Sequence, residues 1–188
     1  MKVGYYSSYD RGLQCLLQIW PQIKEAVPTA ELHIYYGWNT FDSMHKSNPQ
    51  MMQWKFKMLS LMNQDGVTEH GRVSHQELAK AMKGIDVWAY PTMFTEISCI
   101  TAMKAQLAGN YPVVNAVAAL DETVQFGTKL HLDNLYENED QQKAFADAVI
   151  AALESDNDPH DGQEWVKSIY SWESIAKQWM DVCRVVQE

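Results

Sequence analysis

The sequence predicts an α/β fold, a doubly wound, Rossmann-like parallel sheet with helices on both faces. Two observations carry this prediction. Short apolar segments of strand length recur along the chain, and longer segments between them have apolar residues at helical spacing. Strands and helices that alternate in this way imply parallel strands joined by crossover helices. The chain has 188 residues, so we expect residues 1–188 to form one such domain.

Six segments have the length and composition of strands. We expect strands at Val3–Ser7, Glu31–Tyr36, Val67–Val73, Ile85–Tyr90, Pro112–Ala116 and Thr128–Leu132, where Val67–Val73 includes the exit from the third strand. The second shows only weak apolar–polar alternation, which is typical of a parallel strand buried on both faces. The sixth carries the weakest strand signal.

The helical segments lie between these strands and after the last one. We expect helices at Leu13–Ala26, Pro49–Gln64, Ser74–Lys83, Cys99–Ala108, Leu120–Phe126, Glu139–Leu153, Gln163–Tyr170 and Trp172–Val186. Ser74 and Glu77 have the spacing of a capping box, and Ser171 is predicted to cap the last helix. Gly37–Ser47 is predicted to be a loop whose Trp38 and Phe41 face a sugar or a second domain. The other tryptophans fall on apolar stripes, which predicts that they are in the core.

Composition excludes several classes of protein. With 46% hydrophobic and 21% charged residues the chain is globular, and its formal net charge of −9 argues against nucleic-acid binding. Three scattered cysteines, Cys15, Cys99 and Cys183, predict a reducing, cytoplasmic location without disulfides. We expect neither a transmembrane segment nor a metal site, because no apolar run approaches about 20 residues and the six histidines lack ligand spacing.

Two polar loops are expected to meet at one edge of the sheet. If the strand order is 3-2-1-4-5-6, the first and fourth strands are neighbours, and ligands bind beyond their carboxyl ends. Those ends carry the loops Ser7–Gly12 and Pro91–Ser98. Ser98 is a plausible N-cap, which would leave the amides of Cys99, Ile100 and Thr101 to bind an anion.

The stretch around the second loop resembles the donor-site signature of GT-B fold glycosyltransferases close to family 4, the glycosyl transferases group 1. The matching residues are Pro91-Thr92, Glu96, Gly109 and Pro112-Val113-Val114. The resemblance implies that Glu96 contacts the donor sugar as the catalytic carboxylate. Lys104 stands where the family has a second glutamate that commonly holds the ribose. Lys104 is either a ribose or phosphate contact or a solvated lysine on the helix surface.

Three other segments extend the resemblance along the chain. Arg11 occupies the place of a basic residue that grips the donor diphosphate. The amides of Cys99, Ile100 and Thr101 are the other candidates for this contact, and Ser98 could touch the donor as well as cap the helix. Gly71, Arg72 and Val73 resemble the loop that recognises the nucleobase, and His70 beside them is either structural or close to the base. Tyr170–Glu173 resembles the family's C-terminal tryptophan segment.

The resemblance implies the C-terminal half of a retaining hexosyltransferase. Such a domain binds a UDP-, GDP- or ADP-sugar without a metal. The glycan, lipid or protein acceptor binds to an N-terminal domain that these residues do not contain, so we expect this half alone to be inactive. The full-length protein could be peripheral to a membrane. The alternative is a non-catalytic, Rossmann-like nucleotide-binding or interaction module, which Lys104 would also fit.

Overall fold

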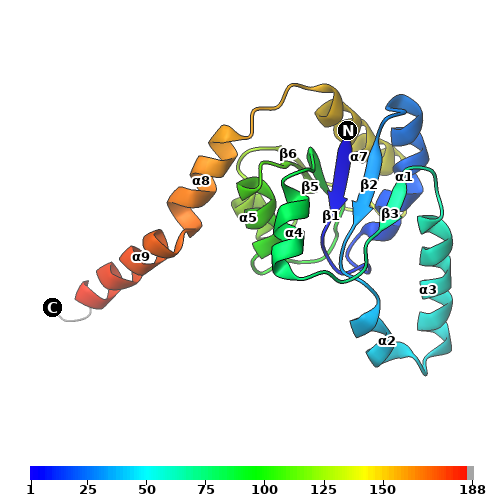
Figure 1. Cartoon of the computed structure of the whole chain (residues 1–188), viewed down its shortest axis with the longest axis horizontal. Coiled ribbons are helices and arrows are strands. Elements are labelled where there is room, and N and C mark those ends of the chain that lie inside the picture. The colour runs from blue at the N-terminus through cyan, green and yellow to red at the C-terminus, as the bar shows by residue number, and fades with distance from the viewer. Residues whose placement is uncertain (186–188) are drawn as a thin grey trace.

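The computed structural model describes residues 1–185 and contains a six-stranded sheet whose neighbouring strands are all parallel. The strand order is β3-β2-β1-β4-β5-β6 (Figure 1), which confirms the predicted doubly wound arrangement. The strands span Lys2–Tyr5 (β1), Glu31–Ile34 (β2), Val67–Glu69 (β3), Val87–Tyr90 (β4), Tyr111–Asn115 (β5) and Thr128–Leu130 (β6). The order reverses between β1 and β4, where Val3 is in register with Val87.

Helices cover both faces of the sheet. They span Leu13–Ala26 (α1), Asn39–His45 (α2), Pro49–Met62 (α3), His75–Met82 (α4), Ile100–Leu107 (α5), Leu120–Thr123 (α6), Glu139–Glu154 (α7), His160–Tyr170 (α8) and Trp172–Val185 (α9). α1 packs against α3 and α7 on one face, and α4 and α5 lie side by side over the other (Figure 1). The largest fully buried side chains, Trp20, Trp88, Tyr5, Tyr90 and Phe145, are in the core between these layers. The predicted end of the last helix, Val186, lies outside the described residues.

The second strand is shorter than predicted, because β2 ends at Ile34 rather than Tyr36. β3 ends at Glu69, within the segment Val67–Val73 that was expected to hold the strand and its exit. Gly37 and Gly71 follow with positive φ angles of 81° and 67°, so the chain turns away from the sheet there. The residues beyond each strand are thereby free to line the edge of the sheet.

The prediction of a loop at Gly37–Ser47 was wrong, because this segment contains α2. Trp38 immediately precedes α2 and packs edge-on against Tyr9 at 4.7 Å and against Trp54 at 5.9 Å between ring centroids. Phe41 contacts the ring of Trp54 at 5.3 Å. These two aromatics therefore join a cluster within the domain.

Local capping signals were reliable at the surface. The Ser74 hydroxyl accepts a hydrogen bond from the N–H of Glu77 at 3.2 Å, and the Glu77 carboxylate accepts one from the N–H of Ser74 at 2.8 Å. The Ser171 hydroxyl accepts from the N–H of Ser174 at 3.2 Å. The predicted caps at Ser74 and Ser171 are confirmed.

The prediction that Trp172 and Trp179 are in the core was wrong, because they are 86% and 67% exposed. Their helix, α9, contacts mainly α8 and extends away from the sheet (Figure 1). A helical stripe of apolar residues therefore forms here without a sheet face to cover it. Within residues 1–185 no helix has the length and apolar character that crossing a membrane requires.

Candidate functional site

The two polar loops meet beyond the carboxyl ends of β1 and β4, as expected. Arg11 Nη1 lies 3.2 Å from Glu96 Oε1, and the Tyr90 hydroxyl donates a hydrogen bond to the same oxygen at 2.7 Å. The Glu96 residue is only 8% exposed. A buried carboxylate of this kind requires partners, and Arg11 and Tyr90 supply them.

Gly12 permits the close approach of the two loops. Its φ angle is +108°, and a Cβ atom built on it would lie 2.3 Å from the carbonyl oxygen of Pro91. Any other residue would be strained in its backbone and would collide with the second loop. The contact between Arg11 and Glu96 depends on this packing.

Arg11 retains the capacity to bind a ligand. Its guanidinium lies 3.8 Å from the centroid of the Phe94 ring, and its side chain is 35% exposed. Burial lowers the pKa of Arg11, but the Glu96 carboxylate raises it, and the net pKa is above the ordinary value. A charged, oriented guanidinium with several donors suits a phosphate oxygen.

The helix that follows the second loop begins one residue later than predicted. Cys99, not Ser98, is at the N-cap position of α5, and its side chain makes no capping hydrogen bond. The first intrahelical bond runs from the N–H of Ala102 to the carbonyl of Cys99 at 3.0 Å, so Ile100 and Thr101 occupy the first turn. Ser98 is exposed in the preceding loop. Burial raises the pKa of the Cys99 thiol to about 11, which keeps it neutral.

A cavity of about 490 Å³, here called the basic pocket, collects several of the predicted residues. It is lined by Tyr6, Tyr35, Tyr36, Arg72, Val73, Ser74, His75, Leu78, Met82, Thr101 and Lys104. Three lining residues are basic, and none of the described residues that line it is Asp or Glu. The fold thus brings Arg72 and Val73, after β3, to Thr101 and Lys104 of α5. Gly71 adjoins the pocket, and its carbonyl accepts a hydrogen bond from the N–H of Tyr36 at 3.1 Å.

The sequence reasoning missed the three tyrosines of this pocket. Tyr6, Tyr35 and Tyr36 follow directly after β1 and β2, so aromatic residues at strand ends were the available signal. The ring of His70 stacks on Tyr35 at 4.4 Å, with 7° between the ring planes, and holds it in place. Burial and the neighbouring His33 ring lower the pKa of His70 below its ordinary value.

The same end of the sheet shows no metal-binding group. Within residues 1–185 no cluster of three or more His, Cys, Asp or Glu side chains could hold a metal ion. The chemistry that the described residues offer here is that of one carboxylate, one guanidinium and the basic pocket.

Comparisons with known proteins place this geometry in context. The model of a family described as glycosyl transferases group 1 matches residues 1–155. No curated protein matches the chain. Among solved structures, a GtfA/B complex aligns over 98% of this chain and 36% of its own, at 16% identity and a TM-score of 0.77.

Two further structures are similar. The sucrose-phosphate synthase of Thermosynechococcus elongatus shares 23% identity over 98% of this chain and 45% of its own, with a TM-score of 0.72. The pneumococcal O-GlcNAc transferase GtfA, in complex with UDP and GlcNAc, shares 12% identity over 100% of this chain and 36% of its own, with a TM-score of 0.72. The chain therefore spans between a third and a half of these structures.

Proposed function

The chain belongs to the glycosyl transferases group 1 family, and from this we propose that it is the donor-binding domain of a glycosyltransferase that uses a nucleotide-diphosphate sugar. The observation that carries the proposal is the basic pocket. In a chain with a net charge of −9, a cavity lined by Arg72, His75 and Lys104 without a carboxylate is selective for an anion. The tyrosines add flat apolar surfaces, so an aromatic anion such as a nucleotide fits best.

The neighbouring residues suit the rest of such a donor. The nucleobase would lie against the tyrosines and Arg72–Val73, and Lys104 would contact the ribose or a phosphate. The diphosphate would extend toward Arg11 and the first turn of α5, whose N–H groups favour anions. The sugar would then lie near Glu96.

The proposed reaction transfers a glycosyl group. The bond between the anomeric carbon and the diphosphate oxygen breaks, and its electron pair leaves with the diphosphate. An acceptor hydroxyl oxygen bonds to that carbon, and its proton passes to the leaving diphosphate. Arg11 would stabilise the charge that grows on the leaving diphosphate. Removal of one such stabilising donor typically lowers the rate by roughly 10²–10³. Glu96, held by Tyr90, would accept hydrogen bonds from sugar hydroxyls and orient the donor.

The acceptor half of the enzyme is part of the same proposal. The similar structures are two to three times as long as this chain, and one of them is a complex with UDP and GlcNAc. We expect acceptor binding, a retaining outcome and full transfer activity only together with a second domain. The isolated residues should bind nucleotide without a metal and transfer little or no sugar.

Titration calorimetry with UDP, GDP and ADP tests the proposal. At least one of the three should bind in the micromolar to millimolar range, and EDTA should not change the affinity. Arg72→Ala should weaken that nucleotide about tenfold, because it removes one charge contact. Lys57→Ala, an exposed lysine of α3, is the matched control and should bind like the parent chain. If none of the nucleotides binds at millimolar concentration, the chain is not a donor-binding domain.

A further inference from the structure

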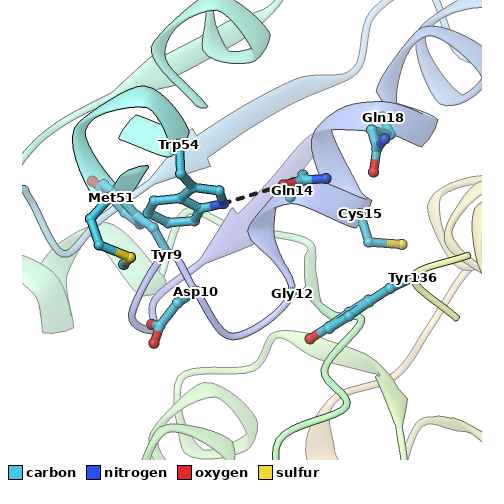
Figure 2. Close-up of a pocket in the computed structure, with 9 residues that line it drawn as sticks. All are labelled: Tyr9, Asp10, Gly12, Gln14, Cys15, Gln18, Met51, Trp54 and Tyr136. Atoms are coloured by element: carbon cyan, nitrogen blue, oxygen red, sulfur yellow. Dashed lines mark hydrogen bonds between the residues drawn. The ribbon is translucent and has the colours of Figure 1, made fainter. Parts of the chain in front are cut away.

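A second cavity near the loop Ser7–Gly12 differs in chemistry from the basic pocket. It has a volume of about 380 Å³ and a largely apolar lining that includes Tyr9, Met51 and Trp54 (Figure 2). Of the described residues that line it, only Asp10 is charged, so it offers no cation to a nucleotide. The walls of the basic pocket are therefore the ones that can control nucleotide binding.

The wall of the basic pocket at Tyr35 is backed by two hydrogen-bonded histidines. The His70 ring covers one face of the Tyr35 ring, and His70 Nε2 lies 2.9 Å from His33 Nδ1. The two imidazole planes differ by 17°, and their centroids are 5.2 Å apart. This separation means that the imidazoles lie side by side along the hydrogen bond rather than face to face. Neither histidine lines the pocket, so His70 is a positioning residue that acts through Tyr35 and through its own charge.

A carboxylate sets the direction of the hydrogen bond between the histidines. Glu31 Oε2 lies 3.2 Å from His33 Nε2, and an ionised carboxylate can only accept, so His33 Nε2 carries a proton. In a neutral His33 the Nδ1 atom is then an acceptor, and it accepts from the Nε2–H group of His70. The basic nitrogen that remains in this histidine chain, Glu31–His33–His70, is Nδ1 of His70.

The histidine chain can take up one proton without losing a hydrogen bond. A proton on His70 Nδ1 leaves the bond from its Nε2–H group to His33 intact, whereas a proton on His33 Nδ1 would set two N–H groups against each other. His70 is exposed at the end of β3, so water can deliver this proton. Partial burial and His33 lower the pKa of His70, while Glu69 raises it, and the net pKa is below the ordinary value.

We propose that the histidine chain couples nucleotide binding in the basic pocket to proton uptake by His70, an inference that rests on the proposed donor-binding function. The imidazolium would stay against Tyr35, because an aromatic face attracts a cation. It would add positive charge behind a pocket whose other basic residues are Arg72, His75 and Lys104. A nucleotide anion therefore binds more tightly to the protonated form, and by linkage a bound nucleotide favours the proton.

Titration calorimetry with UDP, GDP and ADP between about pH 8 and about pH 5.5 tests the coupling. His70→Phe keeps a flat ring against Tyr35 but cannot take up a proton. At about pH 8 the variant should bind nucleotide like the parent chain. The ratio of parent to variant affinity should rise about twofold by about pH 5.5 at low ionic strength, because His70 is exposed to screening water. The nucleotide phosphate, with a pKa of about 6, and His75 titrate in both samples, so the ratio isolates His70.

Two further measurements complete the test. His160→Phe, which removes an exposed histidine of α8, is the matched control, and its ratio to the parent should stay at one over the whole pH range. Imidazole ¹⁵N NMR of the parent chain follows His70 without any substitution. The midpoint of the His70 titration should move to higher pH when the nucleotide is saturating.

The outcomes separate this inference from the proposed function. Nucleotide binding with a constant affinity ratio for His70→Phe, or with an unchanged His70 midpoint in the parent chain, would overturn the coupling alone. If the parent chain binds none of the three nucleotides, the proposed function fails and the coupling fails with it. A ratio that changes equally for His160→Phe would show a general effect of charge, and it would also overturn the role of His70.

Discussion

The two pockets beside the loop Ser7–Gly12 have opposite chemistry. Arg72, His75 and Lys104 line one cavity together with three tyrosines, whereas the other cavity has a largely apolar lining that includes Tyr9, Met51 and Trp54. Consecutive residues of the loop differ as well, because Asp10 lines the second cavity while Arg11 pairs with Glu96. The difference teaches that two cavities of unlike chemistry can form near the reversal point of one parallel sheet.

The largest expected effect comes from Gly12, where the two polar loops approach each other most closely. Gly12→Ala should destabilise the domain by roughly 3 kcal/mol, because the positive φ and the collision with Pro91 act together. Urea unfolding measures this change. Gly71→Ala, at a φ of +67° with nothing near its Cβ, is the control and should cost only about 1 kcal/mol. Equal losses in the two variants would show that the loops are not tightly packed.

Charge reversal in the basic pocket should weaken nucleotide binding without destabilising the fold. Lys104→Glu should weaken UDP by roughly 10- to 100-fold, or about 1.4–2.8 kcal/mol. The thermal midpoint should stay near that of the parent chain, because Lys104 forms no ion pair among the described residues. Identical UDP affinity in both chains would show that Lys104 is an ordinary helix lysine.

The ion pair next to the two pockets should contribute modestly to stability. A double-mutant cycle of Arg11→Met and Glu96→Gln should give a coupling free energy of about 1 kcal/mol, since Arg11 is one-third exposed to screening water. Urea unfolding of the four chains measures it. A coupling energy of zero would mean that Tyr90 alone holds the Glu96 carboxylate.

The smallest expected effect concerns the two buried thiols, Cys15 and Cys99. Burial raises the pKa of Cys15 to about 12 and that of Cys99 to about 11, from an ordinary value of 9.0. The raised pKa values contribute to the free energy of unfolding. This contribution is fully present below pH 9 and is lost as the pH rises from 9 toward 11–12. At pH 8, a thiol reagent should therefore modify exposed Cys183 first. Equally fast modification of all three would contradict the buried positions of Cys15 and Cys99.

Local signals made most of the fold predictable. The capping box at Ser74 and the alternation of strand-length and helical segments both depend on neighbours within a few residues. The failures came where distant parts of the chain decide. Ser98 is not the cap of α5, and the segment Gly37–Ser47 contains a helix. Trp172 is exposed although the apolar residues around it recur at helical spacing.

The sequence by itself determined the α/β class, because apolar periodicity is local. It also placed the Arg11 and Glu96 loops together for a doubly wound strand order, because the connection rules of parallel sheets are topological. Only the tertiary structure decided that three tyrosines join Arg72 and Lys104, and that Trp54 lines a separate cavity together with Asp10 and Gln14. Those groupings depend on the distances between side chains far apart in the chain. Packing of the whole domain sets these distances.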